Sequence, residues 1–295
     1  MGTRQTQASQ SGSIHVEQVT DPICYHGEGP VWSEQWGGLR WLDMLAGDLL
    51  TLRADGAVDR RHVAAVVAAV RPRRGGGAVL GIERGFAFVN ADGTIARLDD
   101  VWSDRSVRMN EGGCDPDGRF YCGSMAYDER SPSGRLYRLD PDGGVLVVLE
   151  KVTISNGLDW SPDGSRAYYI DTPTCRIDVF DYDPAAGLTA RRPFIDLTAE
   201  GAHPDGLTVD REGAVWVAIA NRGVIRRYRA DGGLDEEIAV PAKKVTACAF
   251  GGPGLDHLYI TTSKDGLEPG SDPYAGSLFR LFTGPLGLPV REFAG

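Results

Sequence analysis

The sequence predicts an all-β protein built as a six-bladed β-propeller, and three observations lead to this fold class. Tight-turn tetrapeptides recur along the chain, and short apolar or alternating segments lie between them. These hairpins group into units that repeat roughly every 35–50 residues, the period of propeller blades. Gly is abundant at 39 residues, which favours short strands joined by turns. The tetrapeptides are "RADG" (53–56), "NADG" (90–93), "DPDG" (115–118 and 140–143), "SPDG" (161–164), "DREG" (210–213) and "RADG" (229–232).

Each unit has the order strand, turn, strand, gap, strand, turn, strand, which is the four-stranded pattern of a blade. The unit at residues 63–100, with "GFAFVNADGTIARL", is the least regular. The other five are, in chain order, "GPVWSEQWGGLRWLDMLAGDLLTLRADGAV" (29–58), "GCDPDGRFYCGSM…GRLYRLDPDGGVLVVLE" (113–150), "GLDWSPDGSRAYYIDTPTCRIDVFDYDPAAG" (157–187), "GLTVDREGAVWVAIANRGVIRRYRADGGLDEEI" (206–238) and "ACAFGGPGLDHLYITTSKD…GSLFRLFTG" (247–284). A closed ring of blades has no long exposed sheet edge.

Two short segments remain after the six units are assigned. "SIHVEQV" near the start and "PVREFAG" at the end are expected to share one blade and fasten the ring, with residues 15–20 in the same blade as residues 277–293. We therefore predict a single propeller domain over residues 14–295. The polar residues 1–13 lack the apolar stretch of a secretory signal and are interpreted as a disordered leader.

The composition excludes several classes of partner. A net charge of −10 argues against nucleic acid and anionic membranes, which both need a basic surface. No apolar run is long enough to span a bilayer. The five cysteines are scattered, odd in number and without a C-x-x-C pair, so we expect reduced thiols and a cytoplasmic location. As a separate expectation, the protein is a monomer or weak homo-oligomer.

One position recurs at the start of the first strand of each unit. In a propeller this strand lines the central channel, and its first residues open at one mouth. Counting back eight residues from each first-turn glycine, with a slightly longer turn in the first unit, gives six equivalent positions that are expected to converge: Glu28, Gly77, Asn110, Asn156, Asp205 and Thr246.

Asn156, in "VTISNGLDW", shows why this position suggests a site. Asn-Gly usually marks a hairpin turn, but "SPDG" already supplies a turn eight residues later. We therefore expect Asn156 to head a channel strand and aim its oxygen inward. Two carboxylates and two amide oxygens suit a hard divalent cation, so the sequence predicts a central metal-binding channel. Oxygen ligands favour Ca²⁺, with Zn²⁺, Mg²⁺ and Mn²⁺ as alternatives. The competing interpretation is a set of ordinary loop-to-strand junctions.

Other hydrolase motifs are absent: the sequence has no G-x-S-x-G, no H-E-x-x-H and no P-loop. Two histidines precede predicted ligands by two residues, His26 before Glu28 and His203 before Asp205. Either could face the channel mouth, and His203 is the stronger candidate for contact with a substrate. The alternative for both is an exposed loop histidine.

The motifs "GEGPVW", "RMNEGGCDPDGR", "ISNGLDWSPDG", "HPDGLTVD" and "YAGSLFRL" resemble the SMP-30/gluconolactonase/regucalcin family over about residues 15–290. The resemblance implies a six-bladed propeller with one divalent metal that hydrolyses sugar lactones. It further implies Glu28, Asn156 and Asp205 as metal ligands, and Arg108 and Asn110 as substrate-binding residues. The family often has Glu after "GTMA", and "GSMAYDE" puts Asp128 at that place, so the resemblance implies Asp128 as a further substrate-binding residue. Glu111 stands where the family usually has Asp.

These implications combine into a metal-assisted hydrolysis of a small sugar lactone. Asp205 is predicted to be the general base as well as a ligand, with His203 as the alternative base. Two other functions stay open at this point. The same site could act on phosphotriesters or other esters, or the chain could be a non-enzymatic calcium-binding propeller, although the W-D repeat signature of scaffold propellers is missing.

Overall fold

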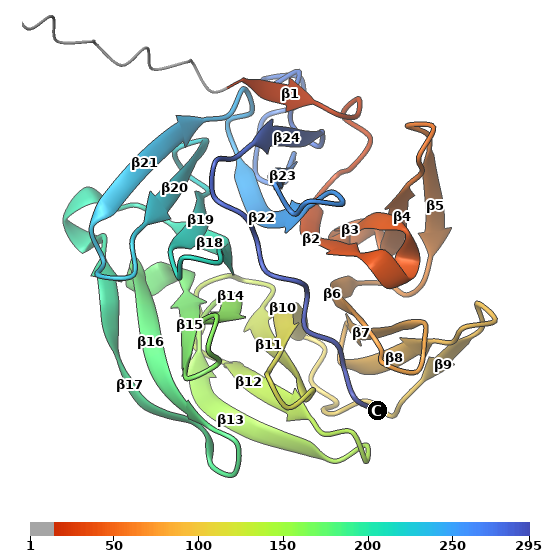
Figure 1. Ribbon diagram of the computed structural model, residues 1–295. Helices are drawn as coiled ribbons and strands as arrows, with labels where there is room; N and C mark the ends of the chain where they lie inside the picture. Colours follow the sequence, from red (N-terminus) through yellow and green to blue (C-terminus); the bar gives the residue numbers. More distant parts are fainter. Residues whose placement is uncertain (1–14) are drawn as a thin grey trace, which may run out of the picture.

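The computed structural model describes residues 15–295, and it confirms the predicted fold class. The described chain forms 24 strands and four short 3-10 helices, arranged as six four-stranded antiparallel sheets around a ring (Figure 1). Tight turns join most of the strands, and many of these turns use a glycine in the left-handed region, as at Gly118 (φ 82°) and Gly213 (φ 81°).

The first three blades follow the chain in order. Blade 1 contains β2 (Gly27–Ser33), β3 (Gly38–Asp43), β4 (Asp48–Leu52) and β5 (Val58–His62), with η1 (Glu34–Trp36) and η2 (Met44–Ala46). Blade 2 contains β6 (Val67–Pro72), β7 (Ala78–Ile82), β8 (Gly85–Val89) and β9 (Ile95–Arg97). Blade 3 contains β10 (Val107–Cys114), β11 (Phe120–Ala126), β12 (Gly134–Leu139) and β13 (Val145–Val152).

The last three blades complete the ring. Blade 4 contains β14 (Ser155–Trp160), β15 (Arg166–Asp171), β16 (Arg176–Asp183) and β17 (Gly187–Asp196), with η3 (Thr172–Thr174). After η4 (Thr198–Glu200), blade 5 contains β18 (Pro204–Val209), β19 (Val215–Ile219), β20 (Val224–Tyr228) and β21 (Leu234–Ala239). Blade 6 contains β22 (Val245–Gly251), β23 (His257–Thr262), β24 (Leu278–Phe282) and β1 (Val16–Gln18).

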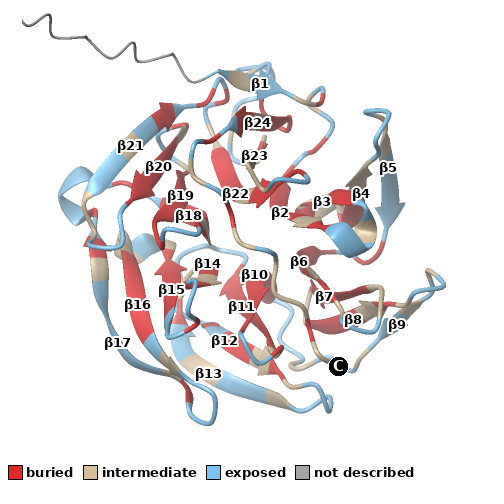
Figure 2. Cartoon of the chain, viewed as in Figure 1, coloured by how far each residue is buried: buried red, intermediate tan, exposed pale blue. Residues whose placement is uncertain are grey.

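The first strand of every blade lines the channel, as predicted. Each of these strands contacts the first strand of the next blade, and β22 contacts β2 to complete the circle. Figure 2 shows that these inner strands are largely buried, whereas the outermost strands, such as β5, β17 and β21, are largely exposed. The apolar core lies between adjacent blades. Between blades 4 and 5, for example, Ile170 and Ile177 join Val215 and Val217 in one cluster.

All six channel strands carry a register shift at the same point. The shift falls between Ser155 and Leu158 in β14, between Pro204 and Leu207 in β18, and at matching places in the other four strands. Such a bulge bends a strand locally and redirects a side chain. The prediction for blade 2 was wrong, because Gly77 lies outside β6. The equivalent residue is Ala68, eight residues before Gly76, whose amide closes the first turn of that blade.

The ring closes through its first strand, as predicted, but the C-terminal tail takes a different course. β1 pairs with β24 in blade 6. Residues 284–295 leave that blade and cross the channel mouth that faces the viewer in Figure 1. There Arg211 N donates to Leu286 O, Phe293 N donates to Pro72 O, and Ala294 N donates to Gly118 O. "PVREFAG" therefore bridges several blades, because its backbone groups find partners on the loops around this mouth.

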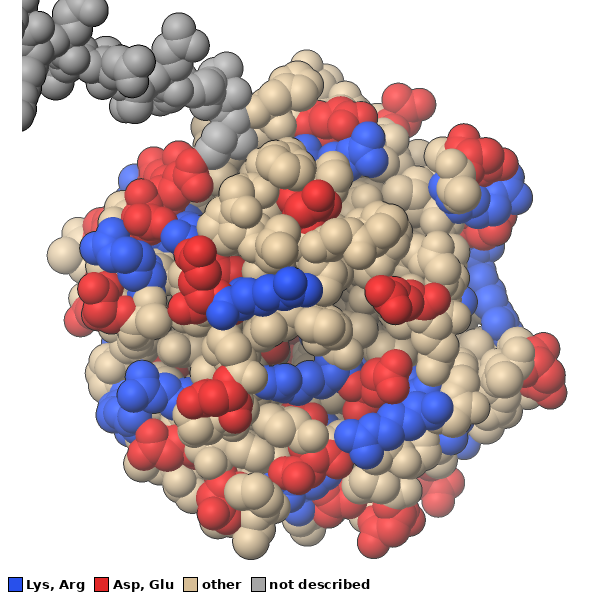
Figure 3. All heavy atoms as spheres, in the orientation of Figure 1, with Lys and Arg blue, Asp and Glu red and all other residues tan. Residues whose placement is uncertain are grey.

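Figure 3 shows acidic and basic side chains interspersed on the tail-covered face, with no broad basic patch. No helix in residues 15–295 is long and apolar enough to cross a membrane. All five cysteines are free thiols, and four of them are buried.

Candidate metal and substrate site

A pocket of about 150 Å³ opens at the channel mouth opposite the tail. It collects residues from the starts of channel strands and from the loops beside them. Its lining consists of His26, Glu28, Arg108, Asn110, Met125, Glu129, Ile154, Asn156, Thr172, His203, Asp205, Ala220, Lys244 and Asp265. The structure thus brings together Glu28, Asn110, Asn156 and Asp205, four of the six positions that the repeat singled out.

The glycines that follow Asn156 and Asp205 are needed for close approach and not for turns. A Cβ on Gly157 would lie 2.8 Å from Asp205 O, on the neighbouring channel strand. A Cβ on Gly206 would lie 2.4 Å from the Ala247 side chain. Neither glycine has a positive φ. The Asn-Gly and Asp-Gly pairs therefore mark points where neighbouring channel strands lie too close for a side chain on the second residue.

Aspartates at the ends of second strands hold the approach to two of these positions. Asp171, the last residue of β15, accepts hydrogen bonds from Thr153 N (3.1 Å) and Ile154 N (2.9 Å), just before Asn156. Asp43, the last residue of β3, accepts from Tyr25 N (3.1 Å) and His26 N (2.9 Å), just before Glu28. Both carboxylates fix the backbone that leads into a bulge, so they act as positioning residues.

Glu28 and Asp205 are buried carboxylates, and no Lys or Arg side chain among residues 15–295 lies within ion-pair distance of either. Glu28 is 3% exposed, and its nearest basic group is His26 Nε2 at 3.7 Å. Burial raises the pKa of Glu28 well above its usual range, and the negative charges of Asp205 and Glu111 raise it further. Burial raises the pKa of Asp205 to about 7, although the charge of Lys244 acts in the opposite direction. Two such groups are costly to ionise together unless a cation lies between them.

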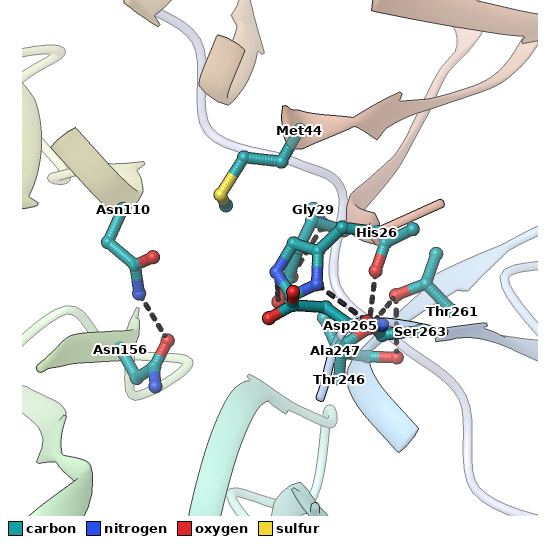
Figure 4. A network of polar contacts seen from close by, with 12 residues as sticks. His26, Gly29, Met44, Asn110, Asn156, Thr246, Ala247, Thr261, Ser263 and Asp265 are labelled. Atoms are coloured by element: carbon teal, nitrogen blue, oxygen red, sulfur yellow. Dashed lines mark hydrogen bonds and ion pairs between the residues drawn. The ribbon is translucent and has the colours of Figure 1, made fainter. Parts of the chain in front are cut away.

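A chain of hydrogen bonds links side chains of blades 3 and 4 across the pocket. Arg108 Nη1 donates to Asn110 Oδ1 (2.7 Å), and Asn110 Nδ2 donates to Asn156 Oδ1 (2.9 Å). Figure 4 shows the two asparagines pointing toward one another. Asn156 Nδ2 then donates to Thr172 Oγ1 (2.7 Å), which donates to Pro204 O (2.7 Å). These bonds assign both amide orientations and leave Asn156 Oδ1 with a second lone pair for another partner.

The two histidines differ in their surroundings. His26 is buried, and its Nδ1 lies 2.7 Å from Ser263 Oγ (Figure 4). Burial lowers the pKa of His26 to about 3, and the charges of Lys244 and Arg108 act in the same direction, so its ring is neutral at pH 7. His203 is exposed and lines the pocket, and its backbone N donates to Asn221 Oδ1 (2.9 Å). His203 is thus the histidine that a substrate can reach directly.

The structure does not bring Asp128 into the pocket. Its carboxylate accepts hydrogen bonds from Arg130 N (2.9 Å) and Ser131 Oγ (2.6 Å) in its own exposed loop. The next residue, Glu129, lines the pocket instead. Glu129 has a left-handed backbone (φ 60°), a strained conformation for a non-glycine residue, and this turn exchanges which of the two carboxylates faces inward.

Sequence reasoning also missed Thr172, Lys244 and Asp265. They come from loops at the ends of different strands, where no repeat or alternation distinguishes them. Only Thr172 could have been found from the sequence. The segment "IDTP" at the end of the second strand of blade 4 aligns with "LDML" at the same place in blade 1.

The donor set fits a divalent cation. No three His, Cys, Asp or Glu side chains within residues 15–295 come close enough to form a metal cluster on their own. The candidate set has two carboxylates, Glu28 and Asp205, and takes its third oxygen from the Asn156 amide. Oxygen donors with two negative charges match Ca²⁺ and other hard cations that keep water ligands.

The comparisons with known proteins show the family to which the chain belongs. The model of the SMP-30/gluconolactonase/LRE-like region matches residues 26–264, so the chain belongs to that family. Regucalcin from Oryctolagus cuniculus is 37% identical over 298 residues, covering 96% of this chain and 99% of the relative. Regucalcin from Homo sapiens is 36% identical over 300 residues, with the same coverage.

Solved structures show the same architecture. A luciferin-regenerating enzyme superposes with a TM-score of 0.88 at 28% identity, covering 96% of this chain and 100% of the other. Regucalcin from Agrobacterium tumefaciens, described as a calcium-binding protein, gives a TM-score of 0.90 at 25% identity, covering 95% and 98%. A gluconolactonase from Xanthomonas campestris shares the fold at 24% identity, with a TM-score of 0.75 and coverage of 91% and 89%.

Proposed function

We propose that this protein is a divalent-metal-dependent hydrolase that opens sugar lactones. The observation that carries the proposal is the pair of buried carboxylates, Glu28 and Asp205, which line one pocket with the Asn156 amide and have no Lys or Arg partner within ion-pair distance. Membership of a family that includes gluconolactonases in its name supports the same chemistry.

Glu28, Asn156 and Asp205 are the residues that would hold the cation, with Ca²⁺ favoured and Zn²⁺, Mg²⁺ and Mn²⁺ as alternatives. When bound, the cation supplies a Lewis acid that polarises the lactone carbonyl and stabilises the developing oxyanion. Asn110 donates both of its N–H groups, to Ser155 O and to Asn156 Oδ1, and accepts from Arg108, so the second lone pair of its Oδ1 is what it can offer to a substrate hydroxyl. His203 lies at the exposed rim of the same pocket.

The reaction consumes one water molecule. The water oxygen bonds to the acyl carbon, the bond from that carbon to the ring oxygen breaks, and the ring oxygen becomes a hydroxyl. The product acid then ionises and releases one proton. Asp205 is the proposed acceptor of the proton from the attacking water. Contact with a cation lowers the basicity of a carboxylate, so His203 is the alternative base.

The test begins with protein stripped of metal by a chelator. Acid release from γ- and δ-aldonolactones is followed after adding Ca²⁺, Mg²⁺, Mn²⁺ or Zn²⁺ separately. We expect one of these ions to restore hydrolysis, and Glu28→Gln to weaken its binding in calorimetry. A phosphotriester and an aryl ester are run in parallel.

Each result separates the candidates. Faster turnover of the phosphotriester or aryl ester than of every lactone would assign the site to a different electrophile. Tight Ca²⁺ binding without any hydrolysis would identify a calcium-binding propeller. Equal activity with and without chelator would show that hydrolysis does not require a metal ion.

A further inference from the structure

A groove of about 460 Å³ lies between blades 1 and 2, and it shares no lining residue with the pocket at the channel mouth. Its floor is one face of blade 1. Arg40, Thr51 and Asp59 are paired across β3, β4 and β5, and the pair of Leu49 and Arg61 lies on the same face two residues further along. The opposite wall consists of the first turn of blade 2 and the turn that joins β8 to β9. A groove of this size can hold a small molecule.

Arg40 is fixed in this groove by an aromatic ring but has no anionic partner. Its Cζ lies 4.4 Å from the ring centroid of Trp36, and Trp36 Nε1 donates to Gly77 O (3.0 Å) on blade 2. The Nε of Arg40 is buried without a hydrogen-bond partner. No carboxylate among residues 15–295 pairs with Arg40, and Asp59, which lies in the same row, is 3.3 Å from Arg53 Nη1 instead. A half-buried cation without a counter-charge is costly, so Arg40 lacks an anion.

Arg61 brings a second positive charge into the same groove. It is exposed, and its Nη2 donates to Gly93 O in the opposite wall, which is a neutral acceptor. Burial lowers the pKa of Arg40, and the charge of Arg61 lowers it further, so the two guanidinium groups repel one another. An anion bound between them would remove this repulsion and give Arg40 its missing acceptor.

The other charged side chains near the groove do not supply that anion. Asp59 is the only acid of the lining, and it is exposed and already paired. Asp92, in the turn between β8 and β9, accepts from Thr94 N (2.8 Å) and does not line the groove. Arg73 adds positive charge, because its Nη1 donates to the Asn90 side chain of the lining (3.4 Å). The groove therefore carries a local excess of positive charge in a chain whose net charge is −10.

We propose that this groove binds a phosphate group, free or carried by a small molecule, and that Arg40 and Arg61 bind its oxygens. A phosphate presents oxygens in several directions, so guanidinium groups from two different strands can both donate to it, whereas a carboxylate has only two oxygens in one plane. The volume leaves room for the rest of a phosphorylated small molecule. The groove is separate from the proposed lactonase site, and neither proposal depends on the other.

Calorimetric titration of the full chain in a phosphate-free buffer tests the proposal. Inorganic phosphate and glucose 6-phosphate are the two probes, and we expect a Kd of about 1 mM or below for at least one of them. Tighter binding of glucose 6-phosphate would assign the site to phosphorylated small molecules, and equal or weaker binding would assign it to the free ion. No binding of either probe at about ten times that concentration would overturn the proposal.

Variants locate the binding in the groove. Arg40→Gln and Arg61→Gln should each weaken phosphate binding by about tenfold or more, through loss of a charge-assisted contact. Arg192→Gln is the matched control, since it removes the same charge from blade 4, where Arg192 pairs with Asp181 (2.7 Å). Equal losses in all three variants would mean that overall charge, and not the groove, attracts the anion. Arg61 is exposed, so unchanged affinity in Arg61→Gln would overturn the proposal even if Arg40→Gln failed to fold.

Asn156→Ala separates the groove from the proposed cation site, because a bound metal ion also attracts phosphate. We expect phosphate affinity in this variant to stay within about twofold of the parent. If Asn156→Ala loses phosphate binding while Arg40→Gln keeps it, the anion binds at the cation and the proposal fails.

Discussion

The channel strands of blades 2 and 4 share a β-bulge at the same place but carry different side chains there. β6 and β14 both shift register at the same point of the strand. In β14 the bulge presents Asn156 to the pocket, whereas in β6 it presents Ala68, which packs in the core. The bulge is therefore a property of the ring, which every blade needs to bring its strands together, and function depends on which side chain occupies it.

Blade 6 gives an intermediate case. Thr246 occupies the equivalent position, but its hydroxyl donates to Gly27 O (2.6 Å) on the neighbouring strand and it does not line the pocket. Figure 4 shows this hydroxyl within a network that includes Thr261. A polar side chain at a bulge can thus serve the contact between strands alone. Of the six equivalent bulge positions, only the carboxylates and amides of blades 1, 3, 4 and 5 line the pocket.

The largest effect is expected at Asp205, which the proposed function makes both a metal ligand and the general base. Asp205→Asn keeps an oxygen donor but cannot accept a proton, so it should retain some metal and lose about 10²- to 10⁴-fold in kcat. Lactone turnover at saturating metal measures this. Hydrolysis close to the parent rate would exclude Asp205 as the base and make His203 the residue to substitute next.

Asn156→Ala should have the next largest effect, by removing one neutral ligand. We expect metal affinity to fall by about tenfold or more, with the fold retained because "SPDG" still makes the turn of the blade. Calorimetric titration with the active metal and thermal unfolding check the two parts. Ala68→Ser at the matching position of blade 2 is the control and should leave metal affinity unchanged.

Asp171→Ala tests whether the backbone that leads into the bulge of β14 affects metal affinity as much as the Asn156 amide does. It leaves Thr153 N and Ile154 N without their acceptor, so the free energy of unfolding should fall by about 1–3 kcal/mol. Metal affinity should weaken less than in Asn156→Ala, because the amide itself remains. Chemical denaturation and metal titration on the same sample compare the two. Stability equal to that of the parent would show that these N–H groups find other acceptors.

Thr246→Val should have the smallest effect on the site. The change keeps the shape of the side chain and removes the hydroxyl that donates to Gly27 O, so stability should fall by about 1 kcal/mol. Metal affinity is expected to stay within about twofold of the parent, which is well under 1 kcal/mol. A loss as large as that of Asn156→Ala would mean that blade 6 contributes to the cation site after all.

The ring could be predicted from the sequence because its turns are encoded locally. Each D-x-x-G-like turn needs a particular glycine, and the spacing between turns sets the strand lengths. The equivalent position in blade 2 was predicted wrongly because "RRGGGAVLG" holds several glycines. The prediction counted back eight residues from Gly85, whereas Gly76 closes the first turn of this blade. The course of the tail was missed because its backbone bonds join residues that are distant in sequence and carry no pattern.

The site was predictable where the repeat or a motif next to it extends to the pocket. Asn110, Asn156 and Asp205 share one offset, Glu28 matches it once the longer first turn is allowed for, and all four line the pocket. Arg108 and His203, predicted from the family resemblance and from the position next to Asp205, line it as well. The exchange of Asp128 for Glu129 depends on a single left-handed residue, which no local pattern indicates. Lys244 and Asp265 enter from loops whose path depends on the whole ring.

The seam in blade 6 has a consequence for how the protein is made. Glu17 pairs with Arg280, 263 residues further along the chain. A growing chain therefore carries β1 without its sheet partner throughout the synthesis of the other blades, and the pocket, which draws on blades 1, 3, 4, 5 and 6, cannot assemble until blade 6 closes. The proposed cation site would therefore form only after blade 6 has been made and has joined β1 to the rest of the ring.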